Sequence, residues 1–121
     1  MSFRRQNPAG RWAGDPTLPL AELRRRWVPE SHVVYIGSAS RPTTVSSNSL
    51  RRRVSAYLRF GAGGNARHRG GYPTWQLGDA DRLLIAWRVV RAPGNPVRFE
   101  HDLLNAHFGL FEALPFANSV F

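Results

Sequence analysis

The chain contains no cysteine and no lysine, and only 8 of its 121 residues are acidic. Without cysteine, neither disulfide bonds nor thiolate zinc sites are available. No apolar run approaches the ~18 residues that a membrane-spanning helix needs. The first residues also lack the apolar stretch of a secretory signal. We therefore expect a cytoplasmic protein with no membrane partner.

Several common catalytic motifs are also missing from the chain. There is no G-x-S-x-G and no P-loop. The stretch 61–66 approximates a G-x-G-x-x-A dinucleotide fingerprint, but that fingerprint must follow a strand, and here it follows a predicted helix. A zinc hydrolase of the H-E-x-x-H type is disfavoured, because that spacing is absent among the four histidines, His32, His68, His101 and His107.

Arginine is what the chain has in excess. All 17 basic residues are arginines, and the formal net charge is +9. The planar guanidinium matches two phosphate oxygens at a time. Codon bias can replace lysine with arginine, but it does not explain 17 basic residues against 8 acidic ones. The excess indicates a polyanionic partner, which we expect to be nucleic acid.

Three segments are predicted to be helical. A short helix is expected over 18–27, and an amphipathic helix over 50–60, where apolar residues recur on one face. A third helix is expected from residue 96 to about 111, with Asn95 as its cap and Pro96 in its first turn.

Two β-branched runs, 33–36 and 83–90, are predicted to be strands. A short extended piece is expected at 75–77, and the tail 114–118 is expected to be extended. The order of the elements favours a single small α/β or α+β domain with helices packed on a short sheet. Residues 1–31 are interpreted as a basic N-terminal extension, and 32–118 as the core.

The predicted helix 96–111 carries a carboxylate among apolar side chains. On a helical wheel of 100° per residue, Glu100 and His107 fall inside the arc formed by its apolar residues, which are Leu103, Leu104, Phe108 and Phe111. A carboxylate that faces a core is costly unless it is paired or binds a metal, so a functional role is favoured for Glu100. The alternative is an edge position stabilised by the helix dipole. His107 is interpreted as a hydrogen-bonded core residue.

The helix predicted over 50–60 places Arg53 one turn before Tyr57. Arg53 lies at the edge of the apolar face, Arg52 lies on the solvent side, and Arg51 flanks the other edge. Arg53 is therefore best placed to reach a sheltered site beside Tyr57, although a plain basic helix face is the alternative.

The glycine-rich loop that follows is basic. It carries Arg67, His68 and Arg69, and its main-chain N–H groups could follow a phosphate backbone. We include these residues with Arg51 as candidate nucleic-acid contacts. A flexible connector is the alternative interpretation of the loop.

Four motifs in this order resemble those of GIY-YIG nucleases. They are the tetrapeptide 34–37 (VYIG), the segment 50–57 (LRRRVSAY), Glu100 in E-x-x-L-L, and the late Asn118. The segment 50–57 is particularly similar to that of the excision-repair members. Stretches within 68–77 and 114–118 look like those of short stand-alone bacterial members. The resemblance covers roughly residues 32–118.

The resemblance implies a small antiparallel sheet of about three strands flanked by helices, and one divalent metal ion, usually Mg²⁺. Tyr35 matches the tyrosine near the attacking water, and Arg53 matches the arginine that stabilises the phosphate. Glu100 matches the metal ligand, and Asn118 matches an asparagine that supports the site. Tyr57 matches a tyrosine found in some members.

One part of the family pattern is missing. No GIY motif stands about ten residues before Tyr35, so its tyrosine is absent or replaced by Trp27 or Tyr72. We expect a metal-dependent endonuclease that acts on DNA rather than RNA, with specificity from within the domain or from a protein partner. The alternatives are a catalytically reduced nucleic-acid-binding module on the same fold and a basic RNA-associated protein of another fold.

Overall fold

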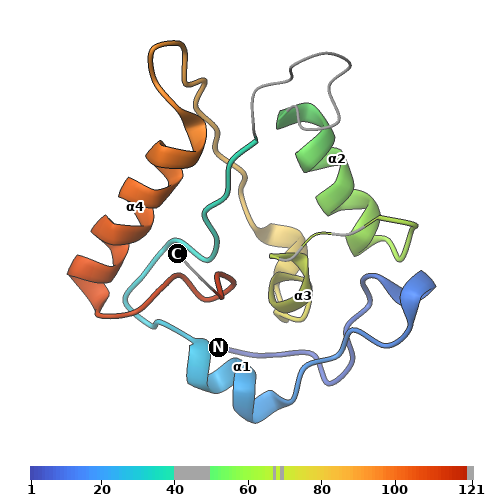
Figure 1. The fold of residues 1–121 in the computed structure, drawn as a ribbon. Helices are drawn as coiled ribbons and strands as arrows, with labels where there is room; N and C mark the ends of the chain where they lie inside the picture. Colours follow the sequence, from blue (N-terminus) through green and yellow to red (C-terminus); the bar gives the residue numbers. More distant parts are fainter. Residues whose placement is uncertain (40–49, 67, 69, 120–121) are drawn as a thin grey trace.

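The computed structural model describes residues 1–39, 50–66, 68 and 70–119. Figure 1 shows α2 and α4 on opposite sides of the molecule, with the extended stretches 33–39 and 83–92 between them in this view. The elements, in chain order, are η1 (Arg11–Ala13), α1 (Leu20–Arg26), α2 (Leu50–Gly61), α3 (Gly71–Thr74), η2 (Ala80–Arg82) and α4 (Pro96–Phe111).

The predicted three-stranded sheet is wrong for the part of the chain that the structure describes. That part contains no strand and has one isolated antiparallel bridge, between Phe3 and Leu77. Residues 33–36 and 83–90 carry no helix, yet no backbone hydrogen bond joins one stretch to the other. β-Branched composition favours an extended backbone, but a sheet also requires a paired edge.

Backbone N–H and C=O groups of the stretch 33–36 make hydrogen bonds with the C-terminal tail instead of with a neighbouring strand. The N–H of Ala117 donates to the carbonyl of Val34 at 2.8 Å. The Asn118 side chain accepts from the Ile36 N–H at 2.9 Å and donates to the Ile36 carbonyl at 2.8 Å. An amide side chain thus does what a neighbouring strand would do.

The three predicted helices are present. Asn95 caps α4, because its Oδ1 accepts from the N–H of Val97 at 2.9 Å and of Arg98 at 3.3 Å. The first helix is shorter than expected and begins after Pro19. The extended piece expected at 75–77 is instead a series of turns that follows α3.

The main core is built from both ends of the chain. Leu23, Leu77 and Phe116 are buried together. Trp27 packs edge-on against Phe116, with ring centroids 5.4 Å apart, and Phe3 stacks on Phe116 at 5.9 Å. Residues 1–31, interpreted from the sequence as an extension, therefore share a core with the rest of the chain.

Gln76 fastens the N-terminal segment to this core. Its side chain is fully buried. It donates to the carbonyls of Arg4 at 3.0 Å and Leu18 at 2.9 Å, and it accepts from the Leu18 N–H at 2.9 Å. Every polar atom of the amide group makes a hydrogen bond, as burial requires.

Among the helices that the structure describes, none has the length and apolar character that crossing a bilayer demands.

Candidate functional site

A pocket of about 190 Å³ lies where α2 meets the stretches 34–38 and 83–86. Four predicted site residues line it: the catalytic candidates Tyr35, Arg53 and Tyr57, and the nucleic-acid candidate His68. The other polar side chains of the lining are Ser38 and Thr74, and its apolar part includes Val34, Leu50, Val54, Leu83, Leu84 and Ile85.

Helical periodicity explains why α2 presents Arg53 to the pocket. Leu50, Val54 and Tyr57 follow the i, i+4, i+7 spacing of one helix face, and Arg53 borders that face. All four line the pocket, and Arg53 is half-buried there. The nucleic-acid candidate Arg51 is exposed, and it does not line this pocket.

Tyr35 is held between two glycines. A Cβ atom at Gly37 would lie 2.8 Å from the Tyr35 ring and its hydroxyl oxygen, and one at Gly70 would lie 2.6 Å from the ring. A side chain at either position would therefore displace the ring. The glycine that ends the tetrapeptide 34–37 is required by the packing of the tyrosine two residues before it.

His68 lies between the two pocket tyrosines. Its ring makes edge-to-face contacts with Tyr35 and Tyr57, with centroids 5.5 Å and 5.1 Å away. The Gly71 N–H donates to Nδ1 at 3.1 Å. Burial, and secondarily the positive charge of Arg53, lowers the pKa of His68 to about 4. The imidazole is therefore neutral at pH 7, and its proton sits on Nε2.

His68, which was predicted as a nucleic-acid contact on a glycine-rich loop, lies inside the pocket. The side chain is only 7% exposed. The neighbouring candidates Arg67 and Arg69 lie outside the described residues. Trp27 and Tyr72, considered as replacements for the missing tyrosine, do not line the pocket. Trp27 belongs to the core, and Tyr72 packs on Phe60 with ring centroids 5.0 Å apart.

The Tyr57 side chain is held in place by its neighbours, and its hydroxyl keeps its proton at neutral pH. Burial raises the pKa of its hydroxyl above the usual value, against the opposing effect of a hydrogen bond with Thr74. The ring stacks on Trp75 at 4.9 Å, and the Trp75 Nε1–H donates to the Tyr57 carbonyl at 3.2 Å. Tyr57 therefore keeps its proton at neutral pH and is a poor base.

Glu100 is connected to the pocket through a hydrogen bond with Ser38. It is half-buried in the first turns of α4, and it does not itself line the pocket. The hydroxyl of Ser38, which does line the pocket, donates a hydrogen bond to Glu100 Oε2. Asn118 lies behind the pocket wall, where it holds the backbone of Ile36. Ser38 carried no sequence signal beyond its place in a polar loop.

His107 is a core residue, as predicted, and takes no part in the pocket. It is 5% exposed. One ring nitrogen is 2.7 Å from Ser31 Oγ, and the other is 2.8 Å from the Ala113 carbonyl. The Ser31 bond joins α4 to the segment before Val33, and the Ala113 bond joins α4 to the residues that follow it.

The chemistry of the donors near Ser38 suits a hard cation. Within the ranges described above, no three His, Cys, Asp or Glu side chains gather at one point. Mg²⁺ does not require such a cage, because it keeps several waters and binds through one or two carboxylates and substrate phosphates. The carboxylate of Glu100 and the hydroxyl of Ser38 are oxygen donors of this kind, so the residues present fit a largely hydrated Mg²⁺.

Comparisons with models of protein families, with curated proteins and with solved structures gave no significant match. Function is therefore inferred from the pocket itself.

Proposed function

We propose that this chain is a metal-dependent endonuclease that hydrolyses phosphodiester bonds in DNA. The observation that carries the proposal is the pocket, in which Tyr35, Arg53 and Tyr57 gather beside the Ser38–Glu100 pair. The net charge of +9 supports a polyanionic substrate. The residue types are those that phosphodiester hydrolysis requires: cations and donors for the phosphate, and groups that orient a water.

Two side chains of the pocket can donate to a phosphate. The Arg53 guanidinium binds two phosphate oxygens through its planar fork and neutralises the charge that develops on them. The Nε2–H of His68 adds a neutral donor, because Nδ1 is committed to the Gly71 N–H. The Tyr57 hydroxyl is instead bonded to Thr74, whose own proton is donated to the Gly70 carbonyl.

Tyr35 is assigned to orienting the attacking water. Its hydroxyl serves there as a hydrogen-bonding group, on the same pocket wall as Ser38 and opposite Arg53 of α2. A magnesium ion held by Glu100 would supply Lewis acidity at the phosphate and lower the pKa of a bound water.

Supercoiled plasmid with Mg²⁺, with and without chelator, tests the activity. Glu100→Gln keeps an acceptor for the Ser38 hydroxyl but removes the charge, so we expect cleavage to fall below detection while DNA binding stays near wild type. Arg53→Ala should abolish cleavage and weaken binding. Its matched control is Arg52→Ala, an exposed arginine one position away, which should leave the chemistry intact. Mg²⁺-dependent cleavage that survives Glu100→Gln would refute the mechanism.

The same assay separates the second candidate, a nucleic-acid-binding module without catalysis. One observation favours it: the Ser38 hydroxyl already occupies an oxygen of the Glu100 carboxylate. Tight, salt-dependent DNA binding without cleavage under any divalent cation would establish the binding module in place of the enzyme.

A further inference from the structure

An apolar groove continues from the pocket along α2. It has a volume of about 410 Å³ and shares Leu50, Val54 and Ile85 with the pocket lining. The residues that extend it beyond the pocket are Arg51, Ser55, Leu58 and Trp87. A chain molecule with one unit in the pocket could therefore place its next units in the groove.

Trp87 forms the outer wall of the groove as an exposed aromatic surface. Its side chain is 71% exposed, and Leu58 across the groove is 51% exposed. Ile85 and Trp87 face the groove together, as residues two apart in an extended backbone do. The next residue, Arg88, turns to the other side, where its guanidinium lies 5.1 Å from the centre of the Phe99 ring.

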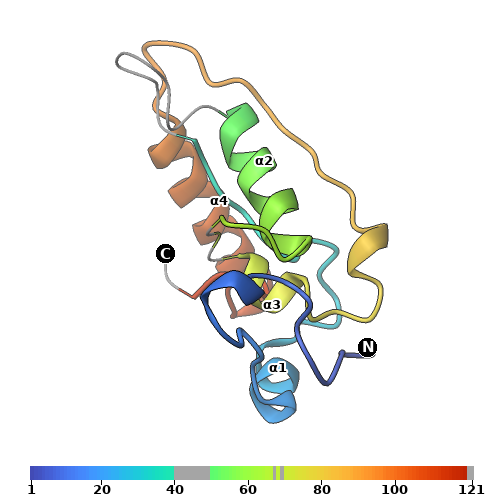
Figure 2. The same ribbon diagram turned by 90° about the vertical axis from the view of Figure 1, so that its right-hand side faces the viewer.

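The segment that carries Trp87 lies at the surface of the molecule. Figure 2 shows it running along one edge between η2 and α4. Residues 84–90 make no backbone hydrogen bond with any other residue in the described ranges. A large indole on such a segment is not explained by core packing.

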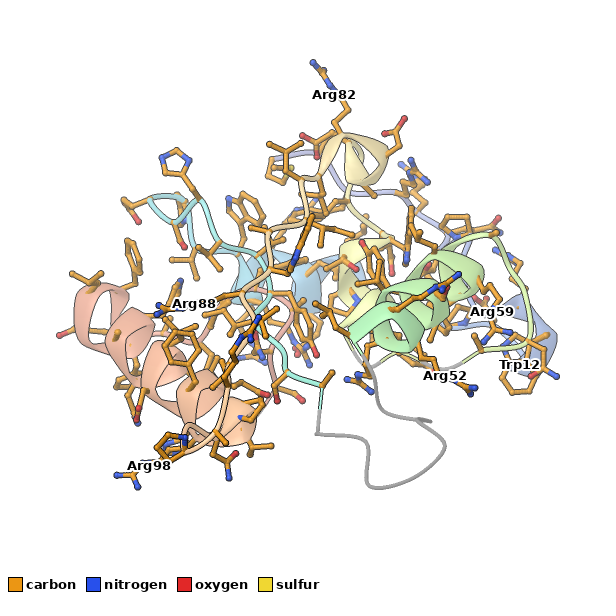
Figure 3. The ribbon with its side chains drawn as sticks, turned by 90° about the horizontal axis from the view of Figure 1, so that it is seen from above. Trp12, Arg52, Arg59, Arg82, Arg88 and Arg98 are labelled. Atoms are coloured by element: carbon orange, nitrogen blue, oxygen red, sulfur yellow. The ribbon has the colours of Figure 1, made fainter. Side chains whose placement is uncertain are left out.

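The charge around the groove selects the occupant. The exposed residues of α2 include three arginines, Arg51, Arg52 and Arg59, and neither α2 nor the stretch 83–99 contains an acidic residue. Figure 3 shows Arg52 and Arg59 projecting from α2. A second copy of the chain would bring arginines against arginines. A flexible polyanion that carries flat apolar rings matches both the cationic rim and the apolar floor.

We propose that this groove binds the unpaired bases of a single-stranded DNA segment, with Trp87 as the stacking platform and a flanking phosphate at Arg53. The inference rests on the proposed function, because it requires the strand to continue into the pocket. It names the substrate class: DNA that is single-stranded at the point of contact. In a duplex the bases stack on each other, so Trp87 could contact only the backbone. Base stacking on aromatic residues is tolerant of sequence, so no base preference is expected at Trp87.

Binding is measured with the full chain in the presence of chelator, so that the result does not depend on cleavage. The probes are a labelled oligothymidylate of about 12 nucleotides, an abasic oligomer of equal length and a duplex of equal length. Trp87→Leu keeps an apolar side chain but removes the ring. We expect it to weaken binding of the oligothymidylate by roughly 5- to 150-fold. Binding of the abasic oligomer and the duplex should not change.

Two further variants sharpen the test. Trp87→Phe keeps an aromatic face and should recover most of the affinity. Trp12→Leu removes another exposed tryptophan, which lies at the right-hand edge of Figure 3 away from Arg88, and it should leave binding unchanged. Because stacking releases no counterions, Trp87→Leu should leave the salt dependence unaltered, whereas Arg51→Gln should reduce it.

Equal affinity of wild type and Trp87→Leu for the oligothymidylate would overturn the inference. So would a wild-type dimer that Trp87→Leu dissociates, because the groove would then be an interface between copies. Failure to cleave both the plasmid and the oligothymidylate in the presence of Mg²⁺, together with Trp87-dependent binding, would rule out the enzyme and leave the groove assignment in place. Cleavage together with Trp87-independent binding would support the enzyme and remove the groove assignment.

Discussion

As the pH falls below 6.5, protonation of His68 should lower the free energy of unfolding. This loss should begin at a higher pH than the loss of the surface ion pairs. Burial holds the pKa of His68 at about 4, against an ordinary value of 6.5. The unfolded chain therefore binds a proton on this ring more readily than the folded chain does. The stabilisation is complete above pH 6.5 and is lost as the pH falls toward 4.

The size of the effect follows from the shift. Each pKa unit corresponds to about 1.36 kcal/mol, so the whole contribution is about 3 kcal/mol. Between pH 7.5 and pH 5 the free energy of unfolding should fall by about 2 kcal/mol from this group alone. In a domain of this length that corresponds to a decrease in Tm on the order of 8 °C. The ion pairs of Glu22, whose pKa is lowered to about 2 by Arg25 and Arg26, are lost at lower pH.

Urea unfolding across this pH range tests the assignment. His68→Asn places an amide oxygen near the position of Nδ1, so it can still accept from the Gly71 N–H, but it does not titrate. This variant should be less stable at neutral pH, because it loses ring contacts with both tyrosines, and its loss of stability toward pH 5 should be smaller by about 2 kcal/mol.

The relative weight of the two causes of the lowered His68 pKa, burial and Arg53, can be tested as well. Arg53→Gln removes the secondary cause of the lowered pKa, so it should reduce the pH dependence only in part. Arg52→Gln, its exposed neighbour, should leave the pH dependence unchanged. If His68→Asn loses as much stability between pH 7.5 and pH 5 as the wild type does, the ring is not the buried neutral group that the structure shows.

Three stability predictions concern single positions. Asn95→Ala removes the acceptor for the first turn of α4 and should cost about 1 kcal/mol in urea unfolding, whereas Asn95→Ser should cost little. Gly61→Ala would normally favour a helix, but here its Cβ would lie 2.0 Å from the Trp75 ring, so thermal unfolding should show a destabilisation of about 1–3 kcal/mol instead of a gain. Asn118→Ala leaves both backbone groups of Ile36 without their side-chain partner and should cost about 1–3 kcal/mol, and faster amide exchange at Ile36 would locate the loss.

The helices could be predicted from the sequence because their signals are local. The spacing of apolar residues and the Asn95–Pro96 boundary gave α4 its observed limits. The wheel placed Leu104 and His107 inside the apolar arc, and both are buried, whereas Leu103 and Phe108 lie at its two ends and are 41% and 45% exposed. No information from other parts of the chain was needed for these results.

The sheet could not be predicted correctly because strand pairing is a property of two segments. The run 33–36 is extended, but its partner is an asparagine side chain and the tail that precedes it, 82 residues away in the case of Ile36 and Asn118. The apolar run 83–90, whose β-branched residues are Ile85, Val89 and Val90, was also predicted to be a strand, yet it lies at the surface beside α2. Composition does not show whether an apolar run finds a strand to pair with.

The pocket shows the same limit for individual residues. Arg53 and Tyr57 are separated by one helical turn, so the sequence could place them together. The neighbours of His68 are Tyr35, 33 residues earlier, and Tyr57, which lies before a glycine-rich loop whose composition suggested exposure. What buries His68 is the Gly71 N–H on its Nδ1 together with two aromatic edges. These surroundings require three segments of the chain to meet at one point: those that carry Tyr35, Tyr57 and His68. For that reason the sequence could name His68 only as a contact on a basic loop, and periodicity and motif spacing could not place it between the two tyrosines.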